Sequence, residues 1–79
     1  MLKTLTSAQC RAARALVKWS VRDLSEMCGV HRNTISALET DQSAPNNSTL
    51  AAIRTALESA GVEFIPENGG GAGVRLRKA

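Results

Sequence analysis

Residues 20–39 read SVRDLSEMCGVHRNTISALE, and this stretch decides the fold. Its apolar positions fit two short helices, about 21–28 and 32–40, that are joined at the stretch CGVH, residues 28–31. Gly29 lies where the first helix needs a left-handed residue at its end, and only glycine adopts that conformation without steric cost. The stretch therefore predicts two helices separated by a tight turn.

The second predicted helix has an apolar side and a polar side. Ile35 and Leu38 form the side that faces the core, as Leu24 does in the first helix. The residues on the outward side are Arg32, Asn33, Ser36 and Ala37. A short helix whose outward side begins with Arg-Asn is suited to meet a DNA groove, and the spacing of the two helices is that of a helix-turn-helix motif.

Two further helices are expected around this motif. The first begins near Thr6 or Ser7 and carries an apolar stripe, formed by Ala8, Ala12, Ala15, Leu16 and Trp19. The last follows the turn-rich segment 40–47, begins with Asn47 or Ser48 as its cap and ends at Gly61. Its inward positions are Leu50, Ile53 and Leu57.

The periodicity changes after residue 61. Residues 62–65 and 73–77 favour two short strands, separated by the glycine-rich stretch PENGGGAG. An isolated two-stranded hairpin is marginal in water, so the strands either pack on the helices as a hairpin or pair with a second subunit. The residues expected at a dimer interface are Val62, Phe64, Val74 and Leu76. We expect residues 1–61 to form a DNA-binding helix-turn-helix domain, with the motif at 20–39, and residues 62–79 to form a strand pair with a glycine-rich turn and a basic end that serves for dimerisation.

The charge of the chain is unevenly distributed. Residues 1–22 carry five basic and no acidic residues, residues 23–68 carry two basic and seven acidic residues, and the tail carries three basic residues. The basic end indicates a polyanion as partner, although the net charge of +3 is too small to hold nucleic acid by itself. Neither a membrane span nor a signal peptide is expected, so we expect a cytoplasmic protein at the nucleoid.

Catalytic, cofactor and metal sites are not expected. Cys28 and His31 have the spacing C-x-x-H, but no second ligand pair follows, so Cys28 is interpreted as a small buried residue and His31 as a helix-start residue. The glycine-rich stretch 69–73 lacks the Lys-Ser/Thr of a phosphate-binding loop. No nucleophile, base and acid occur together, and the chain is too small for a substrate pocket, which excludes an enzyme.

Several short motifs occur in a characteristic order, namely Ala13-Arg14, Trp19-Ser20, Leu24-Ser25, Gly29-Val30, Thr34-Ile35-Ser36, Leu38-Glu39, and Pro45 followed by Thr49-Leu50. Over about residues 8–60 their joint spacing resembles the Xre/Cro-repressor-like helix-turn-helix family. The resemblance implies a mainly α fold, a compact four-helix repressor-like domain, here with a short C-terminal β-hairpin or dimer-forming strands. Many members of that family have a fifth helix where this chain has its strands.

The resemblance also implies roles for individual residues. The helix at 32–40 would enter the major groove of double-stranded DNA, where bases would be read by Arg32, Asn33, Ser36 and Ala37. Backbone phosphates would be bound by Ser20, Val21, Arg22, Thr40, Gln42, Asn46 and Asn47. Arg14 and Glu39 would form an internal ion pair, which leaves Arg11 and Lys18 as the phosphate-binding candidates of the first helix. An arginine can donate two hydrogen bonds to guanine, and an asparagine can pair in the same way with adenine.

Two departures from the family pattern concern this interface. Val21 stands where the family commonly has a glutamine that reaches backbone and bases, so that support is missing here. His31 stands where a serine or threonine usually caps the recognition helix; a neutral imidazole can accept the amide hydrogen, and a cationic one can approach phosphate.

The sequence thus predicts a transcriptional regulator, a repressor that binds a two-fold symmetric operator as a homodimer. One alternative is an antitoxin whose strands bind a toxin. Another is a protein-interaction module that has lost DNA binding, which Val21 and the low net charge favour. The basic tail is predicted as a strand over Val74–Arg77, with a phosphate-binding arm over residues 74–79 as the alternative.

Overall fold

The structure is a computed structural model that describes residues 5–67 and 69–77. Its elements in chain order are α1 (Ser7–Val17), α2 (Val21–Cys28), α3 (Arg32–Glu39), α4 (Asn47–Ser59), β1 (Val62–Ile65) and β2 (Gly73–Leu76). The strands β1 and β2 form an antiparallel hairpin within the chain. The predicted mainly α fold of four helices and a short hairpin is therefore confirmed, and the strands pair within one subunit.

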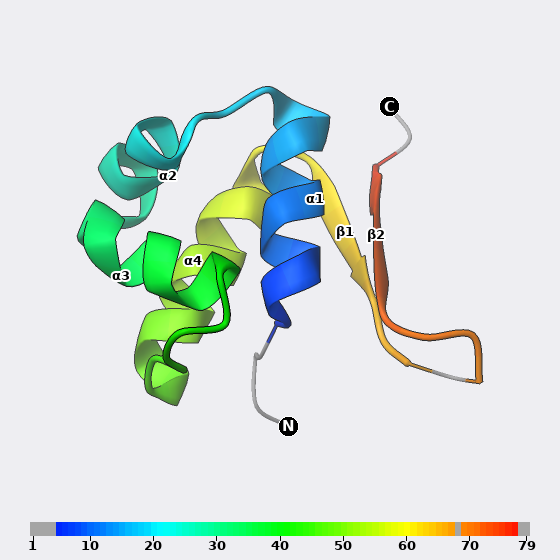
Figure 1. Ribbon diagram of the computed structural model, residues 1–79. Helices are drawn as coiled ribbons and strands as arrows, with labels where there is room; N and C mark the ends of the chain where they lie inside the picture. Colours follow the sequence, from blue (N-terminus) through cyan, green and yellow to red (C-terminus); the bar gives the residue numbers. More distant parts are fainter. Residues whose placement is uncertain (1–4, 68, 78–79) are drawn as a thin grey trace.

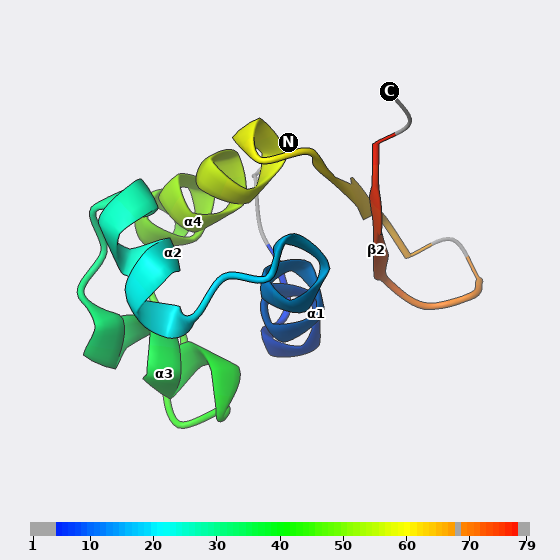
Figure 2. The same cartoon turned by 90° about the horizontal axis from the view of Figure 1, so that it is seen from above.

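Helix α1 lies at the centre of this arrangement. Figure 1 shows α2 and α3 on one side of α1 and the hairpin on the other, and Figure 2, which looks nearly along α1, shows the same order. Helix α4 packs against α1, α2 and β1. In the described part of the chain, no helix has the length and apolar character that crossing a bilayer requires.

Side-chain caps define where the helices begin. Thr6 and Ser20 cap α1 and α2 as predicted, and each forms a reciprocal capping box with the third helical residue, Gln9 or Asp23. The prediction for α4 is wrong by one residue, because Asn46 is its cap and accepts the Thr49 amide at 2.9 Å.

Helix ends follow two different rules. Gly29 ends α2 with a φ of 75°, the left-handed conformation that the sequence indicated. Lys18 ends α1 with a φ of 59° and is a left-handed residue without a glycine. Its backbone amide donates to the carbonyls of Ala15 and Arg14, so the turn that leads into α2 is closed by the backbone.

The core is mostly aliphatic. Its largest fully buried side chains come from α1, α2, α3, α4 and β1 and are Leu24, Ile35, Ile53, Leu57, Val62 and Cys10. The predicted inward positions of α4 are confirmed, since Leu50, Ile53 and Leu57 are all buried. Small residues such as Cys10 and Ala13 face this core from α1 and allow the central helix to pack closely against its neighbours.

Of the apolar stripe predicted for the first helix, only Trp19, which follows the end of α1, packs against the core. Ala8, Ala12, Ala15 and Leu16 are exposed, whereas Gln9, Cys10 and Ala13 are buried. A glutamine can occupy the buried side because its amide is satisfied twice. Gln9 Oε1 accepts the Thr6 amide at 2.9 Å, and Gln9 Nε2 donates to the carbonyl of Gly73 at 3.0 Å.

The hairpin has one face toward the helices and one toward solvent. Val62 is fully buried and lies opposite Leu76, while Phe64 lies opposite Val74, and both are half-buried against the core. Arg54 of α4 lies 4.9 Å from the centre of the Phe64 ring. Of the four residues predicted at a dimer interface, Val62 is therefore enclosed in the core of its own chain, and Leu76 is the most exposed, at 52 %.

An ion pair connects α1 to the end of α3. Arg14 donates from Nη2 to Glu39 Oε1 at 2.7 Å and from Nε to Glu39 Oε2 at 2.8 Å, and Glu39 is only 6 % exposed. Cys10 Sγ also donates to Glu39 Oε2, at 3.2 Å, and Arg11 donates to the backbone carbonyl of Glu39. Three residues on two adjacent turns of α1 thus hold one residue of α3.

The surroundings of Glu39 alter the titration of the groups involved. Burial by itself would raise the pKa of Glu39, but hydrogen bonds from Arg14 and Cys10 and the charges of Arg14 and Arg11 outweigh it, so that the pKa lies below its ordinary value. Burial, together with its hydrogen bond to the Glu39 carboxylate, raises the pKa of the Cys10 thiol. Cys10 therefore stays protonated and serves as a donor to Glu39.

We predict that Arg14→Ala lowers the free energy of unfolding by about 3–5 kcal/mol, because it leaves the buried Glu39 carboxylate without its partner. Arg14→Lys should cause a smaller loss, since it keeps the charge but not the two-pronged geometry. Urea denaturation followed by circular dichroism measures both. The control is Arg22→Ala, which removes an exposed pair with Glu26 and should change the value by less than about 1 kcal/mol. Equal effects of Arg14→Ala and Arg22→Ala would contradict a structural role for the pair.

The lowered pKa of Glu39 predicts a dependence of stability on pH. Its ionised form stabilises the fold fully above the carboxyl pKa of the unfolded chain, about 4.3, and this contribution is lost as the pH falls through the lower pKa of the folded chain. The difference in unfolding free energy between wild type and Glu39→Gln should thus be largest at neutral pH and shrink below about pH 4. Denaturation curves from pH 7 to pH 2.5 test it; a difference that is constant with pH would rule it out.

Candidate nucleic-acid interface

Helix α3 separates its side chains as the sequence indicated. Ile35, Leu38 and Glu39 are buried. On the outer side Arg32, Asn33 and Ser36 are exposed, and Ala37 is half-buried. The structure thus brings the four predicted base-reading residues together on one eight-residue helix, with Ala37 partly covered.

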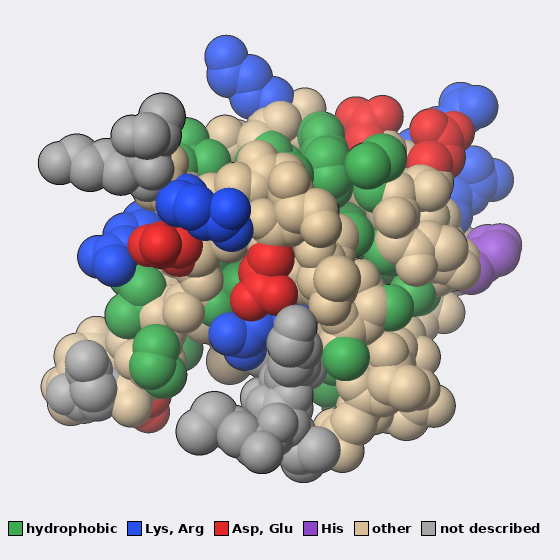
Figure 3. All heavy atoms as spheres, turned by 180° about the vertical axis from the view of Figure 1, so that it is seen from behind, with side chains coloured by type: hydrophobic (Ala, Val, Ile, Leu, Met, Phe, Trp, Pro, Cys, Tyr) green, Lys and Arg blue, Asp and Glu red, His purple; other side chains and the backbone are tan. Residues whose placement is uncertain are grey.

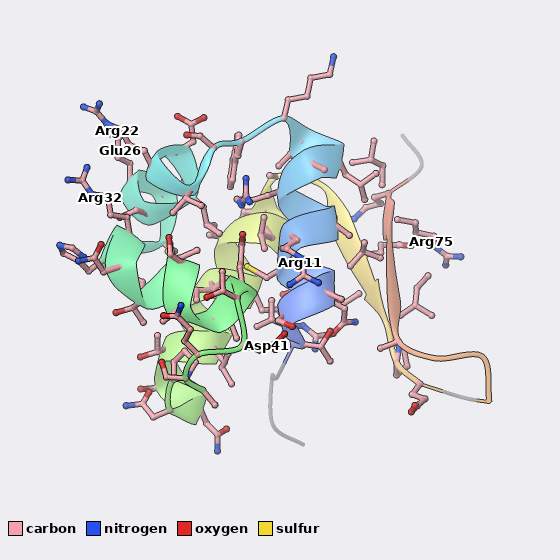
Figure 4. The ribbon with its side chains drawn as sticks, viewed as in Figure 1. Arg11, Arg22, Glu26, Arg32, Asp41 and Arg75 are labelled. Atoms are coloured by element: carbon pink, nitrogen blue, oxygen red, sulfur yellow. The ribbon has the colours of Figure 1, made fainter. Side chains whose placement is uncertain are left out.

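The start of α2 lies next to α3 and contributes a second group. Ser20 and Asp23 hydrogen-bond each other's backbone amides at 2.9 and 3.0 Å, so both side chains are engaged in the cap. Arg22 is exposed and lies 3.6 Å from Glu26. Figure 4 shows Arg22 and Arg32 projecting from the same edge of the molecule. Two predicted contact residues from different helices are therefore neighbours on one side.

Val21 has a structural position. Val21 is the first residue of α2, but its side chain is half-buried and packs against the hydrophobic core instead of facing solvent. The amides of Val21 and Arg22 belong to the first turn of the helix, where backbone donors have no partner within the helix. Any contact of Val21 with phosphate would therefore come from its backbone amide.

The third predicted group lies in the loop after α3 and at the start of α4 and consists of Thr40, Gln42, Asn46 and Asn47, all of which are exposed. Thr40 Oγ1 donates to the carbonyl of Ser36 at 2.8 Å, and the amide of Gln42 donates to the carbonyl of Ala37 at 2.8 Å. These bonds tie the loop to the last turn of α3. Asp41, between them, adopts a left-handed φ of 60° that the sequence gave no reason to expect.

Some of the predicted phosphate-binding side chains are already engaged. Asn46 Oδ1 accepts hydrogen bonds from the Thr49 amide and the Ser48 hydroxyl, which leaves its NH₂ group as the available donor. Arg11 uses one of its guanidinium nitrogens on the carbonyl of Glu39. A guanidinium has five donors in all, so Arg11 can hold the end of α3 and bind an anion at once. Lys18 is exposed at the end of α1.

His31 is the cap of α3. Its Nδ1 accepts a hydrogen bond from the backbone amide of Asn33 at 3.0 Å. This is the first of the two roles considered for His31 in the sequence analysis, a helix cap or a contact with phosphate. Because Nδ1 is an acceptor here, the neutral ring carries its proton on Nε2, which is then a donor. The side chain is exposed, and Figure 3 shows it projecting at the edge of the molecule close to Lys and Arg side chains. The cap and a phosphate contact are therefore compatible.

The cap leads to a prediction about stability. His31→Ala should lower the free energy of unfolding by about 0.5–2 kcal/mol, because the Asn33 amide loses its acceptor, whereas His31→Asn should retain most of the stability. Thermal and urea denaturation of the two variants provide the comparison. If His31→Asn were as unstable as His31→Ala, the hydrogen bond from Asn33 would have no part in the stability of α3.

Metal binding has no support in the described residues. Over 5–67 and 69–77, no three His, Cys, Asp or Glu side chains lie close enough together to hold a metal ion. Cys10 is buried, and Cys28 is half-buried and packs against the core. This side of the molecule exposes arginines, amides and hydroxyls, which are donors suited to phosphates and base edges, and also the carboxylates of Asp23, Glu26 and Asp41.

Comparison with known proteins agrees with this geometry. No curated protein sequence matches the chain significantly. A model of a helix-turn-helix family, HTH_3, matches residues 11–64, which is more than half of the chain and includes all four helices in part or in full. The matched region contains α2, the turn at Gly29 and α3 with its exposed polar side. The chain belongs to this Xre/Cro-like helix-turn-helix family and is a DNA-binding regulator.

Proposed function

We propose that the chain is a transcriptional repressor that binds a two-fold symmetric operator as a homodimer, with α3 of each copy in the major groove. The observation that carries this proposal is the separation of side chains on α3. Arg32, Asn33 and Ser36 are exposed together, while the opposite side of the helix is held in the core. A helix fixed in this way presents the same donors to every DNA molecule it meets.

Base reading would depend on two of these side chains. Arg32 can donate two hydrogen bonds to O6 and N7 of a guanine, and Asn33 can pair with N6 and N7 of an adenine. Ser36 can bond to either base, and the half-buried Ala37 can contact a thymine methyl group. Each good pair discriminates against a wrong base by about 1–3 kcal/mol, so two pairs per copy support sequence-specific binding.

Phosphate contacts would position α3 on the duplex without selecting a sequence. The candidates lie on both sides of α3, namely Arg11, Lys18, Ser20, Val21, Arg22, Thr40, Gln42, Asn46 and Asn47. The backbone amides at the start of α2 are suited to bind a phosphate, as are the arginine side chains. We propose that Arg14 has no direct contact, because both sides of its guanidinium are engaged by Glu39 and the carbonyl of Trp19.

Repression would follow from occupation of the operator. A homodimer of a helix-turn-helix protein binds two half-sites about one helical turn, roughly 34 Å, apart. The chain measures 30 × 26 × 21 Å, so two copies side by side match that separation in scale. A dimer bound within a promoter in the cytoplasm would exclude polymerase, and this mode of action requires neither a cofactor nor enzymatic activity.

A second candidate is an antitoxin that binds DNA and a toxin. The observation that favours it is the exposed end of the hairpin, where Leu76 is 52 % exposed and offers an apolar side chain to another protein. A protein-interaction module without DNA binding is favoured by the acidic residues near α3, Asp23, Glu26 and Asp41, all of which are exposed. Affinity for DNA that falls steeply with salt separates a DNA-binding protein from the interaction module.

The proposed function is tested by selecting bound sites from a random DNA library and measuring the affinity of variants for the selected site. We predict that Arg32→Ala weakens binding by about 1–3 kcal/mol and relaxes the preference at one base pair in each half-site. The matched control is Arg22→Ala, an exposed arginine on the same edge of the molecule (Figure 4) that is proposed to bind phosphate, which should weaken binding about equally on all sequences and leave the base preference unchanged.

Two results would contradict this proposal. An equal loss of affinity on all sequences would assign Arg32 to the DNA backbone instead of a base. A selection that yields no enriched sequence, with little affinity at low or moderate salt, would reject sequence-specific DNA binding and favour the interaction module.

A further inference from the structure

The outer edge of β2 has no paired strand among the residues that the structure describes. Strand β2 pairs with β1 along one edge, and α1 packs against the hairpin. In Figures 1 and 2, β2 is the outermost element, and no helix or strand that the structure describes lies beyond its second edge. Exposed strand edges are templates for pairing with another strand.

The hydrogen bonds of the hairpin show which backbone groups face this edge. The amide of Arg77 donates to the carbonyl of Gly61 at 2.6 Å, which makes these two residues a hydrogen-bonded pair. Such pairs alternate along an antiparallel ladder. With the observed register, Arg75 and Gly73 are the next residues of β2 that are directed toward β1. The amides and carbonyls of Val74 and Leu76 therefore point away from β1, toward the outer edge.

Large apolar side chains of β2 and α1 are exposed as well. Leu76 is 52 % exposed, and Leu16 of α1, the helix that packs against β2, is 37 % exposed. These are two of the three large exposed apolar side chains in the described part of the chain. A hairpin with two strands is marginal in water, and additional strands with an apolar face stabilise it.

We propose that this edge pairs with β2 of a second copy of the chain, antiparallel, around a two-fold axis at Val74. The product is a four-stranded sheet in the order β1, β2, β2 of the second copy and β1 of the second copy. This inference rests on the homodimer of the proposed function and adds to it the surface and the register of the interface.

The charges of β2 select the register. The outward amides and carbonyls of β2 belong to Val74 and Leu76. A symmetric antiparallel pairing of β2 with β2 of the second copy through these groups can therefore be centred on residue 74, 75 or 76. Centring on residue 75 places Arg75 opposite Arg75 of the second copy, and centring on residue 76 places Arg75 opposite Arg77 twice. Like charges directly opposite each other destabilise a strand pair. The centre at Val74 is the register without such a contact.

The register centred on Val74 also suits the remaining residues. Arg75 would lie opposite Gly73 of the second copy, where no side chain competes for space and where each Arg75 keeps its 2.7 Å pair with Glu63. On the other face, the two Val74 side chains would meet between the two Phe64 side chains, and Leu76 would lie opposite Ala72. The edge is thus complementary to itself, which is why a second copy fits it better than an unrelated strand.

Cysteine cross-linking tests the register directly. We would place a single cysteine at Val74→Cys, Arg75→Cys or Leu76→Cys in a Cys28→Ala background and oxidise each protein mildly. A residue on the two-fold axis meets its own copy at about 5.5 Å between Cα atoms, which fits a disulfide. We expect Val74→Cys to form the covalent dimer about tenfold faster than the other two. Faster cross-linking of Arg75→Cys or Leu76→Cys, or none by any variant, would overturn the proposal.

A backbone substitution tests the edge without a cysteine. Leu76→Pro removes an amide that points away from β1, so it should leave the hairpin and the helical circular dichroism intact. It should raise the dimer dissociation constant in sedimentation equilibrium about tenfold or more, since symmetry removes two hydrogen bonds. Leu76→Thr is the matched control, because it also removes the apolar side chain but keeps the amide. Equal dimerisation of the two variants would overturn the proposal.

Binding to the selected DNA site, measured on the same proteins, separates this inference from the proposed function. Specific DNA binding by a chain that fails to cross-link at Val74 would overturn the interface and leave the DNA-binding role in place. Cross-linking at Val74 by a chain with no affinity for DNA would support the interface while the proposed function fails.

Discussion

The bond between Arg14 and Glu39 is the interaction on which the rest of the structure depends. Glu39 ends α3, and its carboxylate and carbonyl receive hydrogen bonds from Cys10, Arg11 and Arg14, all of which belong to α1. A buried carboxylate is tolerated only with such partners. Since Ile35 and Leu38 are buried on the same side of α3, the orientation of the helix is fixed and its polar side must face outward.

The two sides of α1 contact different parts of the structure. Toward α3 the helix presents Cys10, Arg14 and the donors for Glu39, and toward the hairpin it presents Gln9, which binds the carbonyl of Gly73. The candidate DNA interface and the open edge of β2 are consequently separated by the thickness of α1 (Figure 2). Two copies that meet at β2 would therefore keep both α3 helices uncovered, as binding to two half-sites requires.

The helix ends and the outward side of α3 could be predicted from local sequence signals. Features that depend on residues far apart in the sequence could not. Ser20 and Gly29 mark the ends of α2 through backbone rules that act within a few residues, and both follow those rules in the structure. The apolar stripe of α1 did not identify the buried side of the helix. Gln9 is buried there because its side chain donates a hydrogen bond to the carbonyl of Gly73, which is 64 positions away. The left-handed Lys18 carries no glycine signal. Neither the register of the hairpin nor the commitment of Arg11 to Glu39 can be inferred from spacing, whereas the outward side of α3 can.

In the proposed function, α3 is held by α1 and places Arg32 against a base in the major groove. Interference by methylation at guanine N7 on the selected operator tests it most directly, because N7 is exposed in the major groove and accepts the arginine donor. We predict interference at guanines in two half-sites about one helical turn, roughly 34 Å, apart, and the loss of one such position per half-site with Arg32→Ala. Interference that is absent, or unchanged by Arg32→Ala, would contradict it.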